Sequence, residues 1–388
     1  MTDERVTTPD IAARYATFDR EVRARRIPLG GSIDLTYRCN LRCVHCYCGV
    51  RPGSACSTAG PAQSTHDPSS GKRRELSTDQ VLDLLDQIVE AGCLVLLITG
   101  GEPLLRSDFH RIYQHARRAG LLVTVFTNGT LLNDSHVTLF RDLPPHGVEV
   151  SVYGACDETA QKVTGVPGAF SKAAAAVERL KANGINVMAK TVVLKENAHE
   201  LEAIERFFQD RGVRHRMSAD INARLDGDLS VKEHRLSPPE AVAIEFADAS
   251  RAKGWKKWYE RASTFPTSDS LFKCGGGWTN FGIDPFGGLH PCLLASFIER
   301  DLTSMTFADA WASMTEEVRS LKVPAGHQCS TCDKLVICGW CPAFAYLEHG
   351  DAFAACSYLC EFGSERLTQL KTGSATKGQN NEREAKKL

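Results

Sequence analysis

The sequence predicts an α/β protein, a partial (β/α)6 TIM barrel followed by a mostly irregular, cysteine-rich C-terminal domain. Two observations predict this fold class. Between residues 29 and 235, six short apolar segments alternate with segments whose apolar residues recur at helical spacing. From Cys274 to Cys360 the chain is rich in Gly and Pro and has few long periodic segments. Six strand–helix units are too few to close an eight-stranded barrel, so we expect an open sheet.

The expected elements follow one another regularly along the first domain. The six expected strands are residues 32–37, 94–99, 121–127, 148–153, 186–194 and 213–221. The expected helices are residues 77–91, 107–119, 134–143, 171–183 and 200–211, with another near 238–253. Ser77 and Gln80 form a capping box at the start of the first helix, and Gly92 closes that helix. Successive strands are therefore parallel and joined by right-handed crossovers.

Composition divides the chain into five segments. They are an N-terminal segment (1–28), the barrel (29–235), a helical linker (236–265), the cysteine-rich domain (266–370) and a disordered polar tail (371–388). Residues 48–75 are rich in Gly, Ser, Pro and Ala and lack periodicity, which indicates a disordered insertion or a lid.

Charge and hydropathy argue against several classes of function. The 388 residues carry a formal net charge of −1, which argues against binding nucleic acid through its phosphates. No apolar run is long enough to span a bilayer, and the charged N-terminus lacks the apolar segment of a secretory signal. We therefore expect a cytoplasmic protein without a nucleic-acid or membrane partner.

Fifteen cysteines are many for a cytoplasmic chain, and their number is odd. Disulfides are poor candidates in a reducing compartment. Most of the cysteines lie in two tight groups, residues 39–48 and 329–341, with Cys356 and Cys360 near the second. Tight grouping indicates metal binding rather than disulfide cross-links.

The first group, CNLRCVHCYC, directly follows the first expected strand. Cys39, Cys43 and Cys46 have a CxxxCxxC spacing, and such a short loop can bind three corners of an iron–sulfur cube while leaving the fourth iron open. The alternative is a zinc ion held by these three residues and Cys48, although zinc usually takes two separated pairs of ligands.

This loop resembles the signature of the radical S-adenosylmethionine (radical SAM) enzymes. The resemblance implies that Cys39, Cys43 and Cys46 bind a [4Fe–4S] cluster whose open iron is chelated by S-adenosylmethionine (SAM). It also implies that the backbone of His45, next to the last ligand, contacts the adenine. Cys48 is additional to the pattern and receives no role.

Other parts of the sequence extend the resemblance. Gly100-Gly101-Glu102-Pro103 follows the second strand and is similar to the family motif that holds the methionine end of SAM, with Glu102 offering a carboxylate to the ammonium. Thr127, Asn128 and Ser151, at the ends of the next two strands, are similar to further SAM contacts. One departure is Thr164-Gly165, where related enzymes often have Arg-Gly, so another residue must bind the carboxylate if that arginine normally does.

The second cysteine region allows two interpretations. Cys329, Cys332, Cys338 and Cys341 have the paired spacing of a zinc ribbon. That reading does not account for Cys274, Cys292 and Cys360.

The region also resembles the SPASM extension of radical SAM enzymes, an auxiliary-cluster domain with two further [4Fe–4S] clusters. The resemblance implies Cys274, Cys292 and Cys341 as ligands of the first auxiliary cluster. It implies Cys329, Cys332, Cys338 and Cys360 as ligands of the second. Cys356 either replaces Cys360 or completes the first cluster. The gap between Cys338 and Cys341 is one residue shorter than usual.

Several further residues follow strands or flank them. Cys93 flanks an expected buried strand and is predicted to be a core residue. Cys156 follows the fourth strand and is a candidate for a substrate-side role. By position alone, Tyr153, Cys156 and Asp226 are candidates for quenching a product radical.

The resemblance implies that a 5′-deoxyadenosyl radical, formed by reductive cleavage of SAM, abstracts hydrogen from the substrate. Enzymes with this extension commonly modify peptides, so we expect maturation of a ribosomally synthesised peptide. Leu293 after Cys292 disfavours the sulfatase-maturing branch, which has an aspartate there. The alternatives are a dehydrogenase or mutase acting on a sugar or aminoglycoside, and a non-enzymatic iron–sulfur or zinc scaffold. Expected partners are a peptide, an electron donor such as flavodoxin or ferredoxin, and a separate leader-peptide-binding protein.

Overall fold

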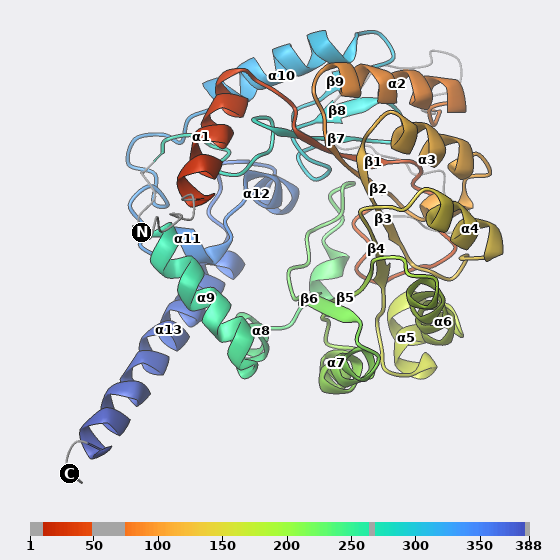
Figure 1. Ribbon diagram of the computed structural model, residues 1–388. Helices are drawn as coiled ribbons and strands as arrows, with labels where there is room; N and C mark the ends of the chain where they lie inside the picture. The colour runs from red at the N-terminus through yellow and green to blue at the C-terminus, as the bar shows by residue number, and fades with distance from the viewer. Residues whose placement is uncertain (1–10, 49–73, 264–267, 385–388) are drawn as a thin grey trace, which may run out of the picture.

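The computed structural model describes residues 11–48, 74–263 and 268–384. Among these residues a nine-stranded sheet has the order β6-β5-β4-β3-β2-β1-β7-β8-β9. The six parallel core strands are β1 (Gly30–Asp34), β2 (Val95–Thr99), β3 (Leu122–Thr127), β4 (Gly147–Ser151), β5 (Val187–Val192) and β6 (Arg214–Ser218). Because β6 and β9 are edge strands, the sheet does not close, and the predicted partial barrel is confirmed (Figure 1). The predicted insertion at 48–75 falls almost wholly outside the described residues.

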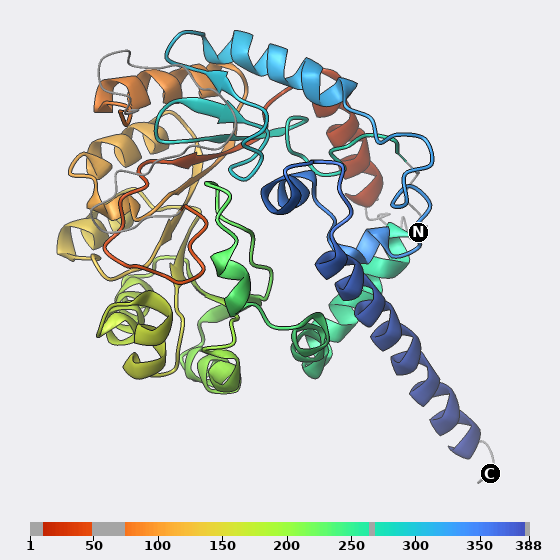
Figure 2. The same cartoon turned by 180° about the vertical axis from the view of Figure 1, so that it is seen from behind.

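Helices cover the outer face of the curved core sheet (Figures 1 and 2). They are α2 (Thr78–Glu90), α3 (Phe109–Arg118), α4 (Asp134–Asp142), α5 (Asp157–Thr164), α6 (Ala169–Ala182) and α7 (Leu201–Asp210). The predicted capping box starts α2, because Ser77 accepts a hydrogen bond from the Gln80 amide and Gln80 accepts one from the Ser77 amide. Four apolar residues at helical spacing, Val81, Leu84, Leu85 and Ile88, are the buried face of α2.

Along each core strand, successive side chains point alternately to the apolar core and to the interior of the barrel. In β4, Val148 and Val150 are buried in the core cluster that includes Phe109 and Phe140 of the outer helices. Glu149 and Ser151 point to the opposite face, as the period of two in a strand requires. The outer face of the sheet therefore provides the apolar core, and the inner face can carry polar chemistry.

Several helices were not expected from the sequence. Two are α1 (Ile11–Ala24) and the eight-residue α5, which is too short for helical periodicity to stand out. The linker contains two helices, α8 (Pro238–Ala247) and α9 (Ala249–Ala262), rather than one. The break falls at Asp248, whose side chain caps α9 by accepting a hydrogen bond from the Arg251 amide at 2.8 Å.

The cysteine-rich region is joined directly to the barrel sheet. Strand β7 (Asn280–Ile283) pairs in parallel with β1, and β8 (Gly288–His290) and β9 (Arg300–Asp301) continue it antiparallel. Gly31 is required in β1 because a Cβ there would lie 2.2 Å from the Phe281 ring. Helix α10 (Phe307–Ser320) covers these strands, so this region contains more regular structure than we expected (Figure 1).

The rest of this region is built from three helices, α11 (Leu335–Cys338), α12 (Pro342–His349) and α13 (Ser357–Glu384). Helix α13 projects away from the body of the molecule and includes most of the tail that we expected to be disordered (Figure 1). Its first turns pack against α8 and α11, and a helix that is already nucleated propagates at little cost through a segment without proline. No helix in the described part of the chain is long and apolar enough to cross a membrane.

Candidate active site

A cavity of about 490 Å³ lies at the carboxyl ends of the core strands. Nine of the residues predicted to act on a ligand or metal line it. They are Cys39, Cys43, His45, Cys46, Gly100, Gly101, Thr127, Asn128 and Ser151. Residues more than one hundred positions apart thus share one cavity, because parallel strands place all their carboxyl ends at the same edge.

The cysteine loop that follows β1 is held by backbone contacts to the end of α5. The Arg42 amide donates to the Thr164 carbonyl at 2.8 Å, and the Val44 amide donates to the Val163 carbonyl at 2.9 Å. The Arg42 guanidinium donates to the Gly165 carbonyl at 3.0 Å. The hydroxyl of Thr164 donates to the Ala160 carbonyl, and Thr164 does not line the cavity. Thr164-Gly165 therefore anchors the cysteine loop and does not face a ligand.

The three cysteines of this loop are partly buried, and polar groups surround Cys39. The Leu41 amide lies 3.4 Å from the Cys39 sulfur, and the Asn128 side-chain nitrogen lies 3.8 Å from it. Burial raises the pKa of Cys39 to about 11 and holds the pKa of Cys43 well above its ordinary value. A metal cluster must displace these protons, while the two N–H donors at Cys39 favour the thiolate that remains.

The two glycines after β2 are required by packing against the cysteine loop. A Cβ on Gly100 would lie 2.4 Å from the Thr36 carbonyl oxygen, and one on Gly101 would lie 2.4 Å from the Arg38 carbonyl oxygen. Gly100 also has φ of +126°, which disfavours any other residue. The close neighbours of the two glycines are therefore the residues that lead into the cysteine loop, and both glycines also line the cavity.

Glu102 is fully buried and does not line the cavity. Its carboxylate accepts hydrogen bonds from the Leu104 amide (3.1 Å), the Thr127 hydroxyl (2.8 Å) and the Asn128 amide (2.7 Å). In the structure Glu102 therefore holds the loops after β2 and β3 together, whereas from the sequence we expect its carboxylate to face a ligand ammonium.

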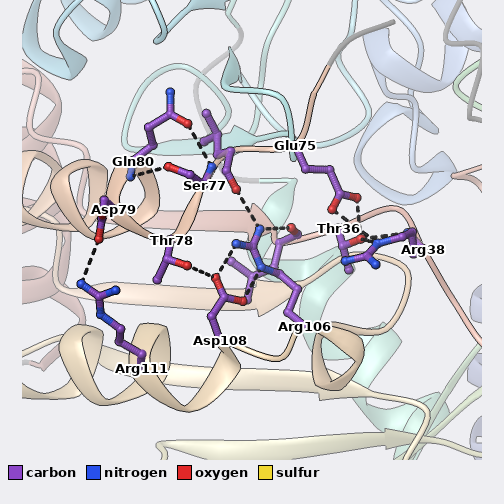
Figure 3. A network of polar contacts seen from close by, with 12 residues as sticks. Thr36, Arg38, Glu75, Ser77, Thr78, Asp79, Gln80, Arg106, Asp108 and Arg111 are labelled. Carbon is purple, nitrogen blue, oxygen red and sulfur yellow. Dashed lines mark hydrogen bonds and ion pairs between the residues drawn. The ribbon is translucent and has the colours of Figure 1, made fainter.

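A network of hydrogen bonds and an ion pair around Arg106 holds the end of β1 (Figure 3). The buried Arg106 donates to the Leu35 carbonyl at 3.0 Å and to the Leu76 carbonyl at 3.2 Å, and it pairs with Asp108 at 2.7 Å. The Arg106 guanidinium lowers the pKa of Asp108 to about 2. Arg106 thus ties the start of the cysteine loop to α2 and α3, a role the sequence analysis did not find.

His45 and Tyr153 form an aromatic wall beside the thiols. Their ring centroids lie 4.8 Å apart in an edge-to-face arrangement, and Tyr153 shares a side-chain hydrogen bond with Ser151. Burial lowers the pKa of His45 to about 4, so its imidazole is neutral. Its buried Nδ1 atom has no hydrogen-bond partner among the described residues, which leaves a polar position for a ligand group.

Two basic residues that were not expected from the sequence also line the cavity. They are Lys190 of β5 and Arg216 of β6, and the Lys190 ammonium lies 4.1 Å from the ring centroid of Phe126 in β3. Arg216 pairs with Glu149 at 2.7 Å. A lysine inside an otherwise apolar strand, VMAKTV, is the signal that could have identified the first of them.

One part of the chain matches a known family. Residues 33–208, which include the cysteine loop and strands β2 to β5, match the family model of the Radical SAM superfamily. Over these residues the chain is similar to that family. The similarity implies a SAM-binding site and a [4Fe–4S] cluster, for which the open sheet and the cysteine loop are the corresponding features.

The relatives that this chain resembles are enzymes with different named products. It is 27% identical over 339 residues to the AdoMet-dependent heme synthase of Methanosarcina barkeri, covering 82% of this chain and 92% of that protein. It is 28% identical to the mycofactocin maturase MftC of Mycobacterium ulcerans, covering 80% and 82%. The alternative of a non-enzymatic scaffold is therefore set aside.

The fold agrees with a solved structure over nearly the whole length of the chain. The crystal structure of Streptococcus suis SuiB bound to its precursor peptide SuiA has a TM-score of 0.65 at 15% identity, covering 93% of this chain and 84% of that one. This likeness shows that the C-terminal region, as well as the barrel, follows a known arrangement.

Electrostatic effects between the thiols of the C-terminal region divide them into two neighbourhoods. Within the described residues, no group of three or more His, Cys, Asp or Glu side chains is arranged to hold a metal ion. Burial raises the pKa of Cys292 to about 12, and nearby Cys341 and Cys274 raise it further. Burial raises the pKa of Cys338 to about 11, with added effects from the second neighbourhood, which consists of Cys329, Cys332 and Cys360. Cys356 is fully buried and interacts with members of both groups, namely Cys341, Cys360 and Cys329.

Three other predicted residues lie away from the cavity. Cys156 is exposed, and its sulfur contacts a Glu200 oxygen at 3.3 Å. Asp226 accepts a hydrogen bond from the Asp228 amide in a turn and does not line the cavity. Cys93 is buried in the core, as predicted. Of the three proposed radical-quenching candidates, the structure brings only Tyr153 into the cavity.

Proposed function

We propose that this radical SAM enzyme modifies a side chain or the backbone of a ribosomally synthesised peptide. The observation that carries the proposal is a groove of about 600 Å³ that adjoins the cavity. The two share the lining residues Met217, Ser218 and Asp220 at the free edge of the sheet. The groove is also lined by Trp255 and Trp258 of α9 and by residues of and beside α11. A cavity with an aromatic groove beside it suits an extended chain better than a compact molecule.

Within this proposal, Cys39, Cys43 and Cys46 bind a [4Fe–4S] cluster with one open iron. When bound, the cluster and SAM supply a 5′-deoxyadenosyl radical that abstracts a hydrogen atom from the peptide. Gly100, Gly101, Thr127, Asn128, Ser151 and the His45 backbone hold SAM against the cluster. Glu102 and Arg106 position these loops, and the buried cavity keeps water away from the reacting carbon.

The C-terminal region is proposed to hold two auxiliary [4Fe–4S] clusters, as in SPASM domains. Cys274, Cys292 and Cys341 would bind the first, and Cys329, Cys332, Cys338 and Cys360 the second. The two neighbourhoods of interacting thiols support this division. Cys356 interacts with Cys341 of the first group and with Cys360 and Cys329 of the second. Because Cys329, Cys332, Cys338 and Cys360 already give the second cluster four ligands, Cys356 is proposed as the fourth ligand of the first. An external electron donor such as flavodoxin or ferredoxin, a separate leader-binding protein and a cytoplasmic location complete the proposal.

A second candidate is a small-molecule reaction on an iron porphyrin. It is favoured by the heme synthase relative, which this chain matches over 92% of the relative's length. A porphyrin ring carries carboxylate side chains, and Lys190 and Arg216 on the cavity wall provide basic partners for such groups. The groove beside α9 has no evident use in that reaction.

The test uses anaerobically reconstituted enzyme with SAM and dithionite. Short peptides encoded beside the gene, and separately Fe-coproporphyrin III, are supplied as substrates, and products are measured by mass spectrometry together with 5′-deoxyadenosine. We expect a mass change in one peptide and none in the porphyrin. Conversion of Fe-coproporphyrin III with no change in any peptide would overturn the peptide proposal and support the second candidate.

The variant Trp258→Ala tests the role of the groove in the same experiment. Because Trp258 is 39% exposed and lines the groove, its removal should weaken peptide turnover while uncoupled formation of 5′-deoxyadenosine continues. The exposed Phe18 of α1, which does not line the groove, serves as the matched Phe18→Ala variant.

A further inference from the structure

Lys190 carries an ammonium group in the cavity that is in no ion pair with a carboxylate of the described residues. It makes no hydrogen bond there either, and its Nζ atom lies 4.1 Å from the Phe126 ring centroid. Burial lowers the pKa of Lys190 and neighbouring Arg216 lowers it further, while the smaller effect of Glu149, which pairs with Arg216, raises it. An unpaired cation that is partly removed from water is costly, so this position favours an anionic ligand group.

The strand register sets Lys190 in a row of polar groups across the barrel wall. Ser151 of β4 is the direct partner of Lys190, and Lys190 is the direct partner of Arg216. Partners in neighbouring parallel strands lie side by side and point to the same face. The Arg216 charge is already paired with Glu149, whereas the Lys190 charge is available beside the Ser151 hydroxyl.

This row of polar groups also lies near the part of the cavity wall that is formed by the cysteine loop, where the cluster is proposed to bind. Ser151 shares a hydrogen bond with Tyr153, whose ring packs against His45 of the cysteine loop. A ligand group held by Ser151 and Lys190 would therefore lie near the wall formed by that loop. Asp220 is the only carboxylate among the lining residues, and it forms no ion pair with Lys190.

We propose that Lys190, with the Ser151 hydroxyl beside it, binds the carboxylate of SAM and thereby fixes the orientation of the methionine end. This inference rests on the proposed function. SAM carries one anionic group, its carboxylate, and two cationic groups, its ammonium and its sulfonium. The Lys190 ammonium attracts the first and repels the other two, so one orientation of the methionine end is favoured. Lys190 is in this sense a binding and positioning residue.

The test compares binding of SAM with binding of decarboxylated SAM, which lacks only the carboxylate. Anaerobically reconstituted holoenzyme is dialysed to equilibrium with each ligand in the absence of reductant, so that neither is cleaved. Wild-type enzyme should prefer SAM. Lys190→Met should weaken SAM binding about tenfold or more, while the affinity for decarboxylated SAM changes less than about twofold.

Two further variants control this experiment. Lys190→Arg, which keeps the charge, should regain most of the preference for SAM, and Lys172→Met on the exposed surface of α6 should behave as wild type. Iron content equal to that of wild type shows that each variant is assembled. An unchanged preference in Lys190→Met, or an equal loss for both ligands, would overturn the inference. If wild-type holoenzyme itself binds neither ligand, the proposed function fails together with it.

Discussion

At the scale of single residues, the site depends on buried groups that never touch the cavity. Glu102 is completely buried, yet its carboxylate receives three hydrogen bonds from the loops after β2 and β3. Burial raises its pKa from 4.5 to about 7, against the opposing effect of those hydrogen bonds. Burial of this carboxyl group costs free energy, and the hydrogen bonds that it accepts fix the positions of Thr127 and Asn128.

The raised pKa of Glu102 predicts a pH dependence of stability. Between about pH 4.5 and 7 the folded chain keeps the Glu102 proton while the unfolded chain loses it, so stability falls as pH rises through this window. The loss is on the order of 3 kcal/mol. Glu102→Gln removes the titrating group, so the difference in thermal midpoint between the variant and wild type should change across this range. A variant of the exposed Glu90, Glu90→Gln, should follow wild type.

A second prediction at the scale of residues concerns Arg106, whose contacts are drawn in Figure 3. Its buried guanidinium binds two backbone carbonyls and Asp108, so Arg106→Met should lower the free energy of unfolding by about 2–3 kcal/mol. Arg111→Met breaks the exposed pair with Asp79 on the same two helices and should cost less than about 1 kcal/mol. Urea unfolding curves measure both, and equal losses would contradict the assignment of Arg106 as a buried support.

At the scale of elements, the barrel and the C-terminal region are locked by a buried ion pair. Arg235, at the end of the 3-10 turn Ser230–His234, pairs with Glu348 of α12, and the two side chains are only 4% and 3% exposed. Lys232 reaches the same carboxylate at 3.2 Å, and the Arg235 guanidinium lies over the Tyr358 ring of α13. The pair therefore joins the end of the barrel to two helices that flank the proposed auxiliary clusters.

Replacing one partner of this ion pair should lower the free energy of unfolding more than replacing both. Glu348→Leu leaves the Arg235 charge buried without a partner and should cost about 3–5 kcal/mol. The double variant Arg235→Met/Glu348→Leu should recover much of that loss, because no buried charge remains. Denaturant unfolding of the three proteins gives the coupling energy. Additive losses would show that the pair does not act as a unit.

At the scale of the whole molecule, three groups of thiols predict the metal content. Anaerobically reconstituted enzyme should hold about twelve irons per chain, with matching sulfide. Cys39→Ala should lower this to about eight and abolish 5′-deoxyadenosine formation, because the two proposed auxiliary clusters would be bound by other cysteines. Cys93→Ala, which alters a buried core cysteine outside all three groups, should keep the full iron content. Zinc without sulfide in the wild-type protein would contradict the cluster assignment.

The barrel was predictable because its signals are local. The capping box at Ser77, the closing glycines and the apolar runs place strands β2 to β5 within two residues of their observed bounds. The short helix α5 and the break at Asp248 were missed, since eight residues are too few for periodicity and a single capping side chain decides the break. The helical tail of α13 was missed because a propagating helix depends on the turns before it.

The sequence by itself determined the open α/β barrel, the cysteine loop and those cavity residues that lie on this loop or at the ends of β2, β3 and β4, because spacing along a strand or loop is a local property. Only the tertiary structure decided that Lys190 and Arg216 face the same cavity, that Glu102 and Arg106 support it from behind, and that Cys156 lies outside it. Those relations depend on strand register and on packing between segments far apart in the chain, and no local pattern encodes either.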